Sequence, residues 1–152
     1  MTLPPRPEYE GLIYGLLDAY PEVVGSTLCM YSTSAFTAIV EGRVTLSNGL
    51  VLRVIEALDF KVGRIRHYSY TVFRGNEQIR WYDSQPHPDD AALTETFPHH
   101  LHESPDIKHN RRPAPGIGFT VPNLPTLIAD CVALGASPVA APSAENDEES
   151  QL

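Results

Sequence analysis

Two short turns constrain most strongly what this chain can fold into. Asn48-Gly49 and Gly75-Asn76 each separate two runs of strand-forming residues, and dipeptides of this kind are the strongest short-range signal of a β-hairpin. The first predicts a type I′ turn in which Leu46 faces Val51, and the second a type II′ turn. The strands of the two hairpins are expected at residues 43–47, 50–58, 64–73 and 77–84.

The second turn also predicts which side chains share a face of the sheet. With Arg74 opposite Glu77, Tyr70 would face Trp81 and Val72 would face Ile79. These four side chains are apolar or aromatic, so we expect them to be buried together. The residues expected on the opposite face, among small hydroxyl side chains that leave room for a ligand, are His67, Arg80 and Tyr82.

Amphipathic segments flank this β-rich region. Residues 8–20 place apolar side chains at helical spacing, and Pro21 ends this pattern. Residues 124–134 also have apolar side chains at helical spacing. Residues 23–31 and 35–41 add two further strand-like runs. We therefore predict an α+β fold, an antiparallel twisted sheet of about five or six strands with an N-terminal and a C-terminal helix packed on one side.

Length and composition predict one domain. A chain of 152 residues with 42% hydrophobic content can bury one core, which we place in residues 1–135. Residues 136–152 are rich in Ala, Ser and Pro and then in acids, so we expect a disordered tail whose removal leaves thermal stability unchanged. No apolar run approaches the roughly 20 residues that span a bilayer, and we expect a cytoplasmic protein.

The charge distribution argues against a binder of duplex nucleic acid. The net charge is −8, although residues 60–112 hold eight basic and seven acidic residues. Such a balanced segment lacks the electrostatic footprint of a duplex binder. It still allows a small site for one phosphate.

Histidine is the most informative residue type for function. All six histidines lie between His67 and His109. Residues 85–118 are rich in proline and glycine, which predicts irregular structure. If the segment around Leu101 is extended, His100 and His102 point to one side and His99 to the other. His-x-His on a strand is a candidate metal pair, but no third ligand stands at a recognisable spacing.

Several segments together resemble one known family. Between about residues 46 and 134 the chain is similar to the TumE-type toxins of bacterial and archaeal toxin-antitoxin systems. The segments that carry the resemblance are Arg80-Trp81-Tyr82-Asp83, Pro86-His87 and Phe97-Pro98-His99-His100-Leu101-His102. His100-Leu101-His102 departs from the family pattern, in which a lysine is expected in the middle.

The resemblance implies a small toxin that is encoded beside a helix-turn-helix antitoxin and stops translation as a metal-independent RNA endonuclease without a cofactor. Histidine can act as general base or acid near neutral pH, and the arginine fork fits phosphate oxygens. The catalytic candidates are His67, Arg80, Tyr82, Asp83, His99, His100 and His102. The residues expected to bind substrate are Glu56, Arg66 and Tyr68.

Two other classes of function remain open from the sequence. One is a metal-dependent hydrolase that uses His99, His100 or His102 together with Asp83. The other is a non-catalytic protein-interaction module in which the histidines only order a loop. The toxin hypothesis expects RNA and a cognate antitoxin as partners, no membrane, and allows a homodimer.

Overall fold

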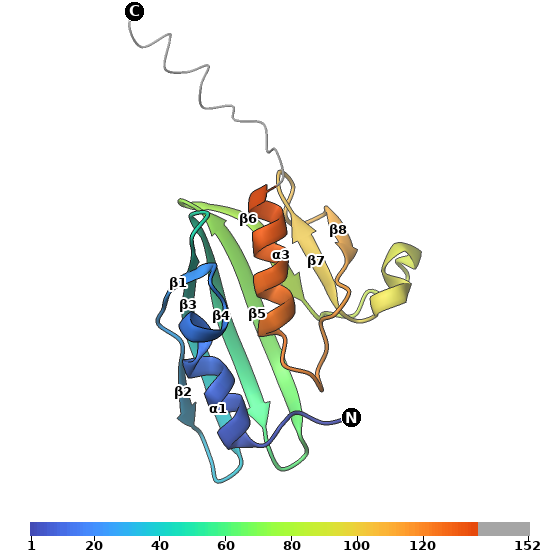
Figure 1. Cartoon of the computed structure of the whole chain (residues 1–152). Helices are drawn as coiled ribbons and strands as arrows, with labels where there is room; N and C mark the ends of the chain where they lie inside the picture. The colour runs from blue at the N-terminus through green and yellow to red at the C-terminus, as the bar shows by residue number, and fades with distance from the viewer. Residues whose placement is uncertain (137–152) are drawn as a thin grey trace, which may run out of the picture.

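The structure is a computed structural model and describes residues 1–136 (Figure 1). Its helices are α1 (Arg6–Tyr14), α2 (Leu16–Ala19), the 3₁₀-helix η1 (Ala91–Thr96) and α3 (Leu124–Ala136). Its strands are β1 (Val23–Ser26), β2 (Cys29–Ser32), β3 (Thr37–Leu46), β4 (Leu50–Asp59), β5 (Arg64–Arg74), β6 (Glu77–Asp83), β7 (His100–Glu103) and β8 (Arg111–Pro113). The predicted tail beyond Ala136 lies outside the described residues.

All strands of the described residues belong to one antiparallel sheet, which confirms the α+β class. The order is β1-β3-β4-β5-β6-β7-β8, and β2 also pairs with β3. The sheet has eight strands, more than the five or six predicted. The two extra strands are β7 and β8, which form in the proline-rich segment that we predicted to be irregular.

The other boundaries differ in ways that the backbone explains. The run predicted over residues 23–31 contains β1 and most of β2, while the strands predicted at residues 35–41 and 43–47 merge into the single strand β3. Gly42 allows β3 to continue past the segment around Thr27. Its φ is +145°, and a Cβ at this position would lie only 2.6 Å from the Thr27 carbonyl oxygen. The predicted helix over residues 8–20 is divided at Gly15 into α1 and α2.

The first hairpin has a different turn from the predicted type I′. Gly49 has a positive φ of +89° and Asn48 does not, and the Gly49 amide donates to the Leu46 carbonyl at 3.0 Å. The loop therefore contains three residues, so Val51 pairs with Thr45 instead of with Leu46, and Val44 pairs with Leu52. This register places two buried aliphatic side chains on the same face, and the predicted register was wrong by one residue.

A β-bulge at Ile79 changes the second hairpin. Arg74 pairs with Glu77 as predicted, but beyond the bulge Tyr70 pairs with Tyr82 and Val72 pairs with Arg80. A bulge adds one residue to one strand, so every later side chain of that strand changes face. The prediction that Trp81 shares the buried face with Tyr70 was therefore wrong.

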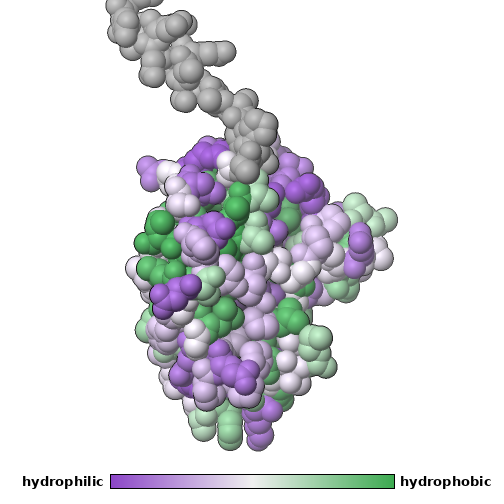
Figure 2. Space-filling view, viewed as in Figure 1, coloured by the Kyte–Doolittle hydropathy of each residue, from purple (hydrophilic) through white to green (hydrophobic). Residues whose placement is uncertain are grey.

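The sheet has two faces that differ in what covers them. The core face is covered by α1 and α3, which both lie in front of the sheet in Figure 1, as predicted. The open face is the opposite side, which α1, α2 and α3 leave uncovered. Figure 2 views the helix-covered side, where hydrophobic and hydrophilic residues are interspersed. No helix of the described residues is long and apolar enough to cross a membrane.

A buried carboxylate joins the elements of the core face. Glu56 on β4 has no exposed surface, and it accepts hydrogen bonds from the hydroxyls of Tyr9 (2.7 Å) and Tyr70 (2.5 Å). Asn123, just before α3, donates to the Tyr70 hydroxyl at 2.9 Å. Burial raises the pKa of Glu56, and the bonds from Tyr70 and Tyr9 offset part of this shift. The network ties α1, β5 and the start of α3 to β4.

Removing one hydroxyl from this network should destabilise the fold. Tyr9→Phe leaves a buried carboxylate oxygen without its donor, which typically costs about 1–3 kcal/mol. Urea unfolding should show this loss. Tyr31→Phe is the matched control, because the Tyr31 hydroxyl is exposed and bonds Glu41, and it should leave the free energy of unfolding unchanged. Equal losses in the two variants would contradict the structural role of Glu56.

Candidate active site

The candidate site lies on the open face where β6, β7 and β8 run side by side. Asp83 on β6 pairs with His100 on β7, and His102 pairs with both Trp81 and Arg111. Paired residues share a face of the sheet, so these five side chains project to the same side. The prediction that His100 and His102 point to one side and His99 to the other is confirmed.

Asp83, His100 and His102 form a compact group, which we name the Asp-His-His cluster. The Nε2 atoms of the two histidines lie 3.1 Å apart. The Asp83 Oδ2 atom lies 3.6 Å from the Nε2 atom of His100 and 3.9 Å from that of His102. Both histidines are buried, and the Asp83 side chain is 18% exposed. The three ligand-type atoms therefore converge on one point that retains access from solvent.

A hydrogen bond indicates the tautomer of His100, and burial shifts the pKa of His102. The Nδ1 atom of His100 lies 3.0 Å from the Pro98 carbonyl oxygen. Because a carbonyl only accepts, this nitrogen carries the proton and Nε2 presents a lone pair in the neutral ring. Burial lowers the pKa of His102, and His100 lowers it further, whereas Asp83 and the Ile107 carbonyl act in the opposite direction.

A pocket borders the cluster. The loop between β6 and β7 crosses His100, since the ring of His87 meets that of His100 edge-on at 5.0 Å. This loop carries η1, which projects beyond β7 and β8 in Figure 1. The pocket has a volume of about 480 Å³. It is lined by Pro86, His87, Pro88, Asp89, Asp90 and Arg111. His87 therefore both lines the pocket and contacts a residue of the cluster.

Arg111 is the cation of this site, and the sequence reasoning missed it. It lies opposite His102 on the open face, close enough for its charge to lower the pKa of His102. No carboxylate forms an ion pair with Arg111 among residues 1–136. The signal that could have identified it is the β7–β8 hairpin, which the surrounding prolines and glycines concealed.

Arg80 and Tyr82 lie on the core face, away from the cluster. The Arg80 guanidinium donates to Glu103 (2.5 Å) and to the Tyr82 hydroxyl (3.4 Å). The Tyr82 hydroxyl donates to Asp130 of α3 at 2.7 Å. The prediction that Arg80 and Tyr82 share a face with His67 was wrong, because the bulge at Ile79 reverses their orientation.

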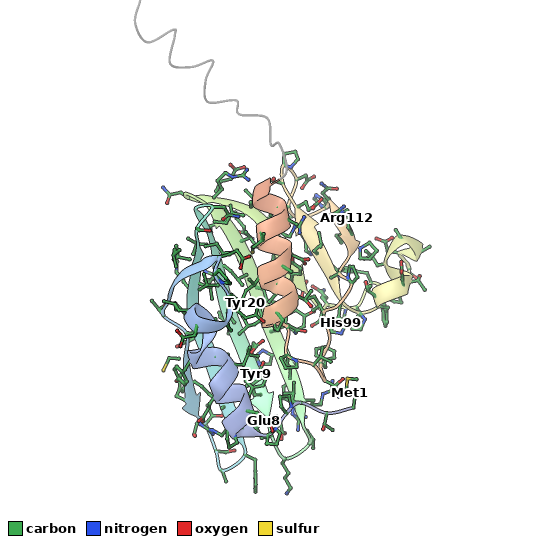
Figure 3. All side chains as sticks on the ribbon, in the orientation of Figure 1. Met1, Glu8, Tyr9, Tyr20, His99 and Arg112 are labelled. Carbon is green, nitrogen blue, oxygen red and sulfur yellow. The ribbon has the colours of Figure 1, made fainter. Side chains whose placement is uncertain are left out.

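His99 and Tyr68 also belong to the core face. The Tyr68 hydroxyl lies 2.7 Å from the His99 Nδ1 atom, and the His99 ring packs edge-on against Phe119 with the ring centroids 4.5 Å apart. His99 is labelled in Figure 3, beside the start of α3. Burial lowers the pKa of His99, and His100 adds to the effect. Both side chains lie on the side of the sheet away from the ligand atoms of the cluster, although the Tyr68 hydroxyl also lies 3.3 Å from the backbone carbonyl oxygen of Asp83.

The remaining predicted residues are not brought to the cluster. Glu56 is enclosed in the core, and Arg66 is paired with Asp59 at 2.5 Å. His67 is exposed and pairs with Ala57 in the sheet. No hydrogen bond or ring contact within residues 1–136 joins His67 to the Asp-His-His cluster.

Among the described residues, the Asp-His-His cluster is the group whose ligand atoms could hold a metal ion. Its three donor atoms lie within 4.8 Å of one another. Two imidazoles and one carboxylate suit a transition metal ion, and neutral or protonated imidazoles suit proton transfer. The same geometry can therefore serve either chemistry.

The fold and the site define a class of protein: a small α+β protein with an Asp-His-His cluster at one edge of an antiparallel sheet, beside an arginine that has no carboxylate partner within residues 1–136. The family model described as Toxin TumE matches residues 13–133. This match covers most of the chain, which therefore belongs to the TumE toxin family. Comparison with curated proteins and with solved structures finds no match.

Two adjacent aromatic residues test the assignment of faces. Tyr82 is fully buried on the core face, so Tyr82→Ala should cost about 3–5 kcal/mol, as is usual for large core aromatics. Trp81 is half-buried on the open face, where it stacks on His102, and Trp81→Ala should cost less than half as much. Urea unfolding measures both. If Trp81→Ala instead lost more free energy of unfolding than Tyr82→Ala, the register predicted from the Gly75-Asn76 turn would be the correct one.

Proposed function

We propose that this chain is the toxin of a toxin-antitoxin pair and an RNA endonuclease whose reactive centre is the Asp-His-His cluster with Arg111. Cleavage of cellular RNA in the cytoplasm would stop translation. The observation that carries the proposal is the convergence of Asp83, His100 and His102 beside a pocket that contains an arginine without a carboxylate partner in residues 1–136. Membership of the TumE toxin family supports the toxin role.

The cluster and Arg111 supply what phosphodiester cleavage requires. Arg111 offers a planar fork of donors for phosphate oxygens. Asp83 and the two histidines offer groups for proton transfer or for holding a metal ion. Arg80, the cation expected from the sequence, is paired with Glu103 on the other face of the sheet. The phosphate contact is therefore assigned to Arg111.

The open face also suits a single strand of RNA. The guanidinium groups of Arg43 and Arg53 each lie 5.7 Å from the centre of the Phe73 ring. Trp81 stacks on His102 with the ring centroids 4.6 Å apart. Aromatic side chains on a sheet can stack with bases, and neighbouring arginines can contact phosphates. A strand bound along this face would lead to the Asp-His-His cluster at its edge.

The expected partners follow from the same proposal. A toxin needs a cognate antitoxin, for which the helix-turn-helix protein implied by the resemblance is the candidate. The RNA substrate would occupy the open face, so an antitoxin that neutralises the toxin has to cover this face or alter it. A homodimer is compatible with the proposal, which does not require one.

Two adjacent arginines provide a matched test of the phosphate contact. Arg111→Gln should slow RNA cleavage by about 100-fold, a typical effect of losing one donor to a transition-state oxyanion. Arg112→Gln should cleave normally, because Arg112 points to the core face and pairs with Glu103; it is labelled in Figure 3. End-labelled RNA and growth of cells expressing each variant provide the two readouts.

The cluster itself is tested in the same assays. Asp83→Asn keeps the size of the side chain and should abolish both cleavage and toxicity. The antitoxin, added to the wild-type chain, should protect the RNA. If the folded wild-type chain leaves RNA intact with or without divalent metal ions, the nuclease proposal is wrong.

Binding of RNA to the open face is tested separately. Arg43→Gln and Arg53→Gln together should weaken the affinity for single-stranded RNA. They should also reduce the slope of log affinity against log salt by roughly 1 for each phosphate that the chain no longer binds. Fluorescence anisotropy of a labelled oligonucleotide at several salt concentrations measures both. Arg6→Gln is the control, since Arg6 pairs with Glu10 on α1, and an equal weakening in this variant would contradict the proposed path.

A further inference from the structure

We propose that the Asp-His-His cluster is a binding site for one divalent transition metal ion of the Zn²⁺ type, ligated by Asp83 Oδ2, His100 Nε2 and His102 Nε2. The ion would be the cofactor of the centre proposed above. Its role in the reaction rests on that proposed function, although the binding of the ion is measured without RNA. A metal-assisted reaction would replace the metal-independent chemistry expected from the resemblance.

The distances within the cluster fit a tetrahedral ion. Zinc–nitrogen and zinc–oxygen bonds of about 2.0–2.1 Å place the ligand atoms of a tetrahedral site about 3.3 Å from one another. The three separations are 3.1, 3.6 and 3.9 Å, which lie around this value. A direct hydrogen bond to the carboxylate would bring an imidazole nitrogen to about 2.7–2.9 Å, and neither histidine approaches Asp83 that closely.

The arrangement of lone pairs also favours a cation at the centre. The Pro98 carbonyl fixes the proton of His100 on Nδ1, so its Nε2 atom presents a lone pair toward His102 and Asp83. A carbonyl behind a ligating histidine is the usual second partner that orients such a ring on a metal. The Nε2 atom of His102 and an oxygen of Asp83 face the same point, and the 3.1 Å contact between the two Nε2 atoms is a hydrogen bond in which His102 donates. A divalent ion would replace this proton and receive a lone pair from each of the three atoms.

The fold provides the ligands at positions that the backbone holds. His100 and His102 are two residues apart on β7, and Asp83 is the direct pairing partner of His100 on β6. Ligands on paired strands keep their spacing better than ligands on loops. Three protein ligands leave one position of a tetrahedral ion open for water or for a substrate oxygen. This open position is the pattern of a catalytic site, whereas a purely structural site has four protein ligands.

Metal binding should be measured on the purified full chain after treatment with a chelator and removal of the chelator. Isothermal titration with Zn²⁺ should give one ion per chain, and Co²⁺ should give the intense visible absorption of a tetrahedral site. Zn²⁺ should also raise the melting temperature of the wild-type chain, because the ion binds the folded state. Asp83→Asn and His102→Ala should each lose the cobalt spectrum and the rise in melting temperature.

The chain offers a matched control for these variants. His109 and Asp106 form a histidine–aspartate pair at 3.1 Å that is exposed and, within the described residues, lacks a third ligand. His109→Ala should therefore bind one ion as the wild-type chain does. Circular dichroism identifies which variants are folded. Asp83→Asn keeps the size of the side chain, so it tests the site even if His102→Ala does not fold.

The outcomes separate this metal site from the proposed function. Failure of the folded wild-type chain to bind Zn²⁺ or Co²⁺, or unchanged binding in folded Asp83→Asn, overturns the metal site. RNA cleavage that persists after chelation overturns the role of the ion as cofactor and retains the nuclease. Binding of one ion without cleavage of any RNA supports the metal site and overturns the nuclease.

Discussion

The β-bulge at Ile79 is the constraint on which the arrangement of this molecule depends. One extra residue in β6 places Arg80 and Tyr82 on the core face and turns Trp81 and Asp83 to the open face. Because β7 pairs with β6, the same extra residue places the side chains of His100 and His102 on the face that carries Asp83. Without the bulge, Asp83 would point toward the helices. The bulge also allows Ile79 and Tyr82 to be buried, and this burial favours it.

The two faces of the sheet use polar groups in opposite ways. On the core face they bind one another: Glu56 accepts from Tyr9 and Tyr70, and Arg80 is paired with Glu103, although the Arg80 Nε atom has no hydrogen-bond partner among the described residues. Buried polar groups with complete partners stabilise and specify a fold. On the open face, Arg111 lacks a carboxylate partner within the described range, and the three ligand-type atoms of the Asp-His-His cluster converge. The donors of Arg111 and the ligand atoms of the cluster can still bind a ligand, and the candidate site is therefore assigned to the open face.

The histidine-rich stretch shows how one segment can serve both faces. Alternation along an extended chain sends His99 to the core face and His100 to the open face. His99 then acts in packing, through Tyr68 and Phe119, and His100 belongs to the cluster. The six histidines of the sequence are therefore not one site. Only two of them lie in the Asp-His-His cluster, and His87 borders it.

The sequence by itself determined the class of fold, the positions of both turns and the two helical regions, because these depend on local patterns of apolar residues and glycines, and it indicated the segment that carries the candidate site. It also determined the alternation of His99 and His100, since adjacent residues of any strand point to opposite sides. Only the tertiary structure decided the faces of Arg80 and Trp81, the strands β7 and β8 and the place of Arg111. A bulge and strand pairing depend on contacts between distant residues, here the packing of Tyr82 against Tyr70 and α3. Local patterns do not contain that information.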